Sequence, residues 1–132
     1  MGLLQNIQRF FSTHTETSEN HPISELRSHY YKVTNKKAIE TVQEVLKRTE
    51  GFEVTSVSEE RGEISVNVLK PKKALLIVTI ISVRPLETAV DFSVSTDTPL
   101  PTDFGYSRKL ISTVYNKLDR EMTFVGTGIH SS

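Results

Sequence analysis

The hydrophobic positions of this chain are most concentrated in residues 74–83, which read ALLIVTIISV without a charge. Side chains alternate between the two faces of a β-strand. One face of a strand here would carry Leu76, Val78 and Ile80, and the other would carry Leu75, Ile77, Ile81 and Val83. A strand with one solvated face alternates apolar and polar residues. The pattern therefore predicts a strand with apolar side chains on both faces, and something must cover the second face.

Apolar residues in the neighbouring segments repeat at the periods typical of amphipathic strands and helices. Alternation predicts strands at 27–33, 52–58, 63–69 and 88–96. Apolar residues at helical spacing predict one helix that begins near Thr34 or Asn35 and ends at Gly51, and a second capped by Thr102 or Asp103. The order β-α-β-β-β-β-α predicts a two-layer α+β domain. Both helices would pack on one face of an antiparallel meander of four to five strands.

The first residues follow a helical pattern of their own. Their apolar positions fall on one helical face and are Leu3, Leu4, Ile7, Phe10 and Phe11. Residues 1–12 are therefore predicted to form a tethered amphipathic helix, which is too short to be stable in water without a surface to fold on. Residues 13–25 are almost entirely polar and predict a flexible linker. The α+β domain would span 26–125, and 126–132 would be a disordered tail.

Two helices cover one face of the sheet, so Leu75, Ile77, Ile81 and Val83 are left on the other. Three interpretations stay open: neighbouring side chains shield the stripe, a second copy of the chain pairs with it, or the N-terminal helix or a ligand covers it. That helix could also dock elsewhere on the domain or lie in a membrane interface. Arg9 is its one basic residue, whereas interfacial helices are usually rich in Lys and Arg.

Composition narrows the function classes. The length of 132 residues fits one domain, and 16 basic residues balance 16 acidic ones. Zero net charge argues against a nucleic-acid binder that works by bulk electrostatics. The chain has no Cys, which excludes disulfides, thiolate nucleophiles and Cys-based metal sites. No apolar run approaches membrane-spanning length and no signal peptide is recognisable, so a cytoplasmic location is expected.

Candidate chemistry is sparse. The chain has no Gly-rich phosphate loop, nucleophile elbow or His-Glu-x-x-His motif. His14, His21 and His130 lack metal-ligand spacing, and Lys70, Lys72 and Lys73 are typical of a solvated loop. We therefore expect no catalytic, cofactor-binding or metal-binding residues. The sequence favours a non-enzymatic interaction module with a protein partner or a second copy of itself. The alternative is a binder of a small apolar ligand, or of a peripheral membrane surface through the N-terminal helix.

The C-terminal third carries a resemblance. A Ser-containing strand, Val90-Asp91-Phe92-Ser93-Val94-Ser95, precedes a helix that opens Asp103-Phe104-Gly105-Tyr106-Ser107-Arg108. This is similar to the end of the bacterial domain-of-unknown-function family 1499, where a Ser-rich strand precedes Asp-Phe/Leu-Gly-x-Asn-Arg. The match covers about a quarter of the chain. Ser107 replaces the family's Asn, and the family's Cys-containing N-terminal signature is missing.

The resemblance implies a bacterial α+β domain that ends in this strand and helix, and it implies no activity. Any site that follows the pattern would use Asp103, Gly105 and Arg108. In physical terms, Asp103 is expected to cap the helix, and Gly105 to allow close packing. Arg108 is expected to pair with Asp91 or with a ligand.

Overall fold

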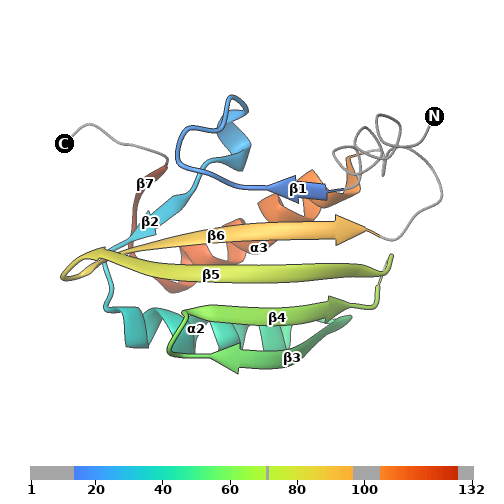
Figure 1. Ribbon diagram of the computed structural model, residues 1–132, viewed down its shortest axis with the longest axis horizontal. Coiled ribbons are helices and arrows are strands. Elements are labelled where there is room, and N and C mark those ends of the chain that lie inside the picture. The colour runs from blue at the N-terminus through green and yellow to red at the C-terminus, as the bar shows by residue number, and fades with distance from the viewer. Residues whose placement is uncertain (1–13, 71, 97–104, 128–132) are drawn as a thin grey trace.

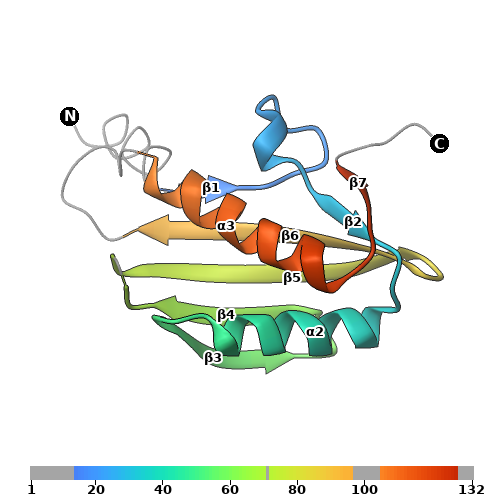
Figure 2. The same ribbon diagram turned by 180° about the vertical axis from the view of Figure 1, so that it is seen from behind.

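The computed structural model of the chain describes residues 14–70, 72–96 and 105–127 (Figure 1). Two α-helices lie on one face of a seven-stranded sheet, as the two opposite views show (Figures 1 and 2). The strands are β1 (His14–Glu16), β2 (His29–Tyr31), β3 (Phe52–Ser58), β4 (Glu63–Val68), β5 (Ala74–Arg84), β6 (Glu87–Thr96) and β7 (Phe124–Thr127). The helices are the 3-10 turn η1 (Ser24–Leu26), α2 (Asn35–Arg48) and α3 (Tyr106–Glu121).

The sheet is a meander with additions at one edge. Its order is β3-β4-β5-β6-β2-β7, and every strand pair is antiparallel. The outer edge of β6 pairs with two short strands, β2 at 88–90 and β1 at 93–95. The predicted two-layer α+β class and the meander β3 to β6 are confirmed. The predicted count of four to five strands is wrong, because β1 and β7 extend the sheet.

Both helices bury the stripes that their spacing predicts. Thr34 caps α2, where its Oγ1 accepts a hydrogen bond from the backbone N–H of Lys37 at 3.2 Å. The inward residues of α2 are Ala38, Ile39, Val42, Val45 and Leu46, and all are buried. They pack over the inner face of the sheet, where β5 presents Leu76, Val78 and Ile80. One of the two apolar sets of β5 is thus part of the core.

The predicted flexible linker at 13–25 is wrong from residue 14 onward. Its residues form β1 and most of η1, and the buried Leu26 anchors the segment. The backbone N–H of Thr17 donates to the Phe92 carbonyl at 2.9 Å, and that of Ser18 to the Leu26 carbonyl at 3.1 Å. These bonds come from the backbone, which pairs along an exposed strand edge whatever the side chains are. A polar composition therefore did not reveal them.

The predicted tail at 126–132 is also wrong at its start, because Gly126 and Thr127 belong to β7. The predicted amphipathic helix at 1–12 lies outside the described residues, as do Asp103 and residues 128–132. In the part of the chain that the structure describes, no helix is both long and apolar enough to cross a membrane.

Candidate functional site

The helices leave one face of the sheet open (Figure 1). This open face carries the second apolar set of β5. Leu75 is 44% exposed, Ile81 52% and Val83 46%, whereas Ile77 is half-buried. In the strand register, Leu75 lies between Asn67 and Ser95, whose side chains are short and polar. Such neighbours do not shield a Leu side chain. Thr79 separates Ile77 from Ile81 along β5, and Val83 lies at a register shift between Ser82 and Arg84. We call Leu75, Ile77, Ile81 and Val83 the β5 stripe.

The two ends of the β5 stripe differ in their surroundings. β4 pairs with β5 only as far as Thr79, so Ile81 and Val83 lie where β6 is the single strand beside β5. The hairpin turn beyond them contains Leu86, which is 53% exposed and has a φ of 60°. A left-handed backbone is uncommon for a non-glycine residue. This end of the stripe is an exposed apolar hairpin tip.

The other end of the stripe borders a hollow of about 520 Å³. Residues from β4, the β4–β5 connection, β5 and β6 line it, among them Asn67, Leu69, Lys73, Leu75, Ser95 and Thr96. Leu69 is 49% exposed, so the hollow has two half-exposed Leu side chains within a polar surround. At its edge, the Nδ1 atom of His14 and the Oγ atom of Ser95 are 2.7 Å apart.

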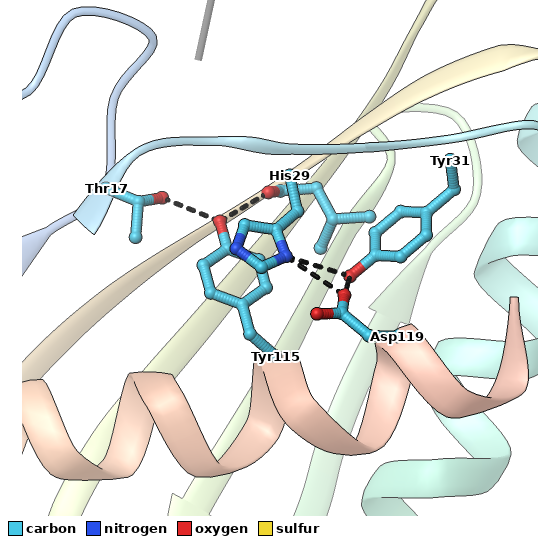
Figure 3. A network of polar contacts seen from close by, with 6 residues as sticks. Thr17, His29, Tyr31, Tyr115 and Asp119 are labelled. Atoms are coloured by element: carbon cyan, nitrogen blue, oxygen red, sulfur yellow. Dashed lines mark hydrogen bonds and ion pairs between the residues drawn. The ribbon is translucent and has the colours of Figure 1, made fainter. Parts of the chain in front are cut away.

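A polar cluster that the sequence did not predict lies on the side of the sheet that the helices cover (Figure 3). His29 and Tyr31 come from β2, and Tyr115 and Asp119 from α3. The Tyr31 hydroxyl donates to Asp119 Oδ1 at 2.6 Å, and His29 Nδ1 lies 3.0 Å from the same oxygen. The Tyr115 hydroxyl donates to the Val90 carbonyl at 2.7 Å. The cluster fastens α3 to β2 and to the edge of β6.

Burial sets the charge states of this cluster. Desolvation lowers the pKa of His29, although the hydrogen bond and the negative charge of Asp119 oppose the shift. Desolvation also raises the pKa of Tyr31 and of Tyr115, so both phenols stay protonated and act as donors. An ionised carboxylate only accepts hydrogen bonds. His29 in its neutral form therefore carries its proton on Nδ1 and donates it to Asp119.

A chain of hydroxyl groups continues to the open face. Asp91 Oδ1 accepts from Thr17 Oγ1 at 2.6 Å and from Ser28 Oγ at 2.5 Å. Thr17 Oγ1 also accepts from the backbone N–H of Phe92 at 2.9 Å, and the Tyr115 hydroxyl lies 3.4 Å from it. These contacts fill the edge of β6 between its pairings with β1 and β2. The polar groups serve to close the fold at this edge.

Two local features of the sequence belong to this cluster, although neither was sufficient to predict it. His29 and Tyr31 alternate along one predicted strand, and Tyr115 and Asp119 are four residues apart on one predicted helix. Neither pair shows that the strand and the helix meet. Within the described ranges, no three His, Asp or Glu side chains are placed to hold a metal ion.

Of the three positions taken from the family resemblance, the structure describes Gly105 and Arg108. Arg108 Nη2 donates to Glu25 Oε1 at 3.0 Å, so the expected pairing with Asp91 is wrong. Gly105 is the N-cap residue of α3 with a φ of 82°. Among the described residues, no heavy atom lies within 4 Å of a Cβ atom built there, so the expected close packing against them is wrong. The backbone conformation explains the glycine instead.

Comparisons with known proteins add a distant fold neighbour. No family model matches the chain, and no curated protein matches it. Among solved structures, this chain is similar to TTHA0849 from Thermus thermophilus, with 14% sequence identity and a TM-score of 0.34. The similar region covers 79% of this chain and 87% of TTHA0849. A likeness this weak carries no argument about the fold or the function of this chain.

Proposed function

We propose that the protein is a non-enzymatic interaction module whose contact surface is the β5 stripe. The observation that carries this proposal is the exposure of Leu75, Ile81 and Val83 at 44%, 52% and 46% on the face that the helices leave open. Large apolar side chains exposed on one strand within a polar surface are typical of interaction sites. The partner is a protein, either a second copy of the chain or a different one.

The hairpin tip supports the same proposal. Leu86 holds a left-handed φ of 60° in a position that suits glycine, and it exposes a large apolar side chain there. Backbone strain that serves no packing is found more often at functional sites than elsewhere. Together, Ile81, Val83 and Leu86 give a partner a compact apolar point of contact at one end of the stripe.

The non-enzymatic part of the proposal rests on how the polar cluster is used. Asp119 accepts hydrogen bonds from His29 and Tyr31, and Asp91 accepts from Thr17 and Ser28. These groups join secondary-structure elements to one another. A bacterial origin and a cytoplasmic location are part of the proposal, and the resemblance of residues 88–118 to family 1499 supports the former.

Sedimentation velocity over a range of concentrations tests the self-pairing form of this proposal. If two copies pair through the stripe, the sedimentation coefficient of the native chain rises with concentration. The Ile81→Asp variant then sediments as a monomer throughout. Glu44→Asp, on the exposed surface of α2, is the matched control and behaves like the native chain. A native chain that is monomeric at every concentration excludes self-pairing and leaves a different protein as the partner.

A further inference from the structure

We propose that residues 1–13 of the same chain pack into the hollow beside Leu75 and cover that end of the β5 stripe. The inference rests on the proposed function, because it describes what occupies part of the contact surface before a partner binds. The segment would act as an internal competitor for that surface. A partner that needs the whole stripe would have to displace it.

The point where the described chain begins supports this occupant. His14 pairs with Ser95, and Ser95 pairs with Leu75 on its other side. Neighbouring strands are about 4.8 Å apart, so the backbone of His14 lies about 10 Å from that of Leu75 across the sheet. The described chain therefore begins beside Ser95, which lines the hollow together with Leu75.

The direction of β1 leads to the same end of the sheet. β1 is antiparallel to β6, so the chain before His14 continues toward the end of β6 at Thr96. Thr96 pairs with Ala74, the first residue of β5, and both line the hollow. Length therefore permits the contact without any rearrangement of the described strands.

The chemistry of the two surfaces is complementary. Leu3, Leu4, Ile7, Phe10 and Phe11 share one helical face in the sequence, and Arg9 is the one charged side chain in the segment. A helical stripe from residue 3 to residue 11 spans about 12 Å. The hollow offers the half-exposed Leu69 and Leu75, with Ile77 next along the stripe. A helix this short needs an apolar surface in order to form.

Spin labelling of the full chain tests this contact. The protein has no Cys, so a single introduced Cys gives one defined label. Asn67→Cys places the label on the open face beside Leu75, and Glu44→Cys places it on α2 behind the sheet; both residues are exposed. We expect the label at 67 to broaden the amide NMR signals of residues 3–11, and the label at 44 to leave them sharp. Reduction of the label should restore the signals.

A second variant shows that the apolar face makes the contact. In the Ile7→Asp chain labelled at position 67, the signals of residues 3–11 should stay sharp, because the charged side chain disfavours burial. Gln8→Asp, on the polar face of the same predicted helix, is the matched control and should keep the broadening.

Three outcomes would overturn the inference. Sharp signals with the label at 67 would show that the segment does not lie in the hollow. Equal broadening from both labels would show that it has no preferred site. Broadening that appears when spin-labelled chains are mixed with isotope-labelled, spin-label-free chains would show that a second copy is the occupant. None of these results tests the contact at Ile81, at the far end of the stripe. The proposed function can therefore be refuted or supported independently of this inference.

Discussion

His29 and Tyr115 stack face to face, with ring centroids 3.5 Å apart and ring planes 7° from parallel. The stack joins β2 to α3. Phe92 also contacts the Tyr115 ring in a tilted arrangement, with a centroid distance of 4.5 Å and an interplanar angle of 58°. Stacked rings stabilise a fold beyond the area they bury. The side chains that contact the stack are therefore expected to contribute to the stability of the packing of α3 on the sheet.

Replacement of Asp119 by Asn should destabilise the fold. The carboxylate accepts hydrogen bonds from both His29 and Tyr31, and the amide that replaces it accepts them more weakly and presents N–H groups to two donors. We expect a loss of about 1–3 kcal/mol in the free energy of unfolding, measured by urea denaturation. Glu121→Gln is the control, because its ion pair with Arg48 is exposed and its loss should be near zero. Equal effects from the two variants would contradict a structural role for the cluster.

Stability should decrease as the pH falls through the titration of His29. Burial lowers the pKa of His29 in the folded state below its ordinary value of 6.5. The unfolded chain therefore binds a proton before the folded chain does, and the free energy of unfolding decreases as the pH drops from 6.5 toward the lowered pKa. Above 6.5 this contribution is fully present.

Urea denaturation at a series of pH values measures this dependence. His29→Gln removes the titrating group, so its stability should change less with pH across that window than the stability of the native chain. The remaining His residues are common to both proteins and cancel in the comparison. Parallel pH profiles for the native chain and the variant would show that His29 titrates alike in the folded and unfolded states.

Replacement by Ala should destabilise the fold to different extents at two glycines that have left-handed backbones. Gly62 has a φ of 64°, and a Cβ atom there would lie 2.2 Å from the Ile80 carbonyl oxygen. Gly105 has a φ of 82°, and among the described residues no heavy atom lies within 4 Å of the same position. Gly105→Ala should therefore cost about 1–2 kcal/mol from its backbone conformation alone. Gly62→Ala should cost more, because the β3–β4 turn must also move away from β5. Thermal unfolding of both variants measures the difference, and equal losses would refute the close approach at Gly62.

Local patterns were enough to predict the parts of the fold that depend on local periodicity. The meander strands and both long helices have apolar residues at a regular period, so their existence and type follow from neighbouring residues. The start of the last helix does not, because its N-cap is Gly105 and not the predicted Thr102 or Asp103. β1 and β7 are only three and four residues long, too short to show a hydrophobic period. They form because the edges of β6 and β2 offer them backbone partners. The β5 stripe could be predicted for the same local reason, whereas the hairpin tip at Leu86 depends on the turn geometry.

The polar cluster could not be predicted because its members come together only in the folded chain. His29 and Asp119 are 90 residues apart, and no local spacing relates them. The same applies to Arg108, whose partner Glu25 lies in a segment that the composition assigned to a linker. Contacts between residues far apart in the sequence depend on strand order and helix placement. These cannot be read from the local pattern of one sequence.

Site-specific photo-crosslinking in the cells that produce the protein tests the contact surface most directly. A photo-reactive amino acid at Ile81, on the β5 stripe, should give a discrete adduct, whose mass distinguishes a second copy of the chain from another protein. The same group at Glu44, equally solvent-facing on α2, should give none. A discrete adduct from position 81 alone is the predicted result. Absence of an adduct at 81, or identical adducts from both positions, would contradict the assignment of the β5 stripe as the interaction surface.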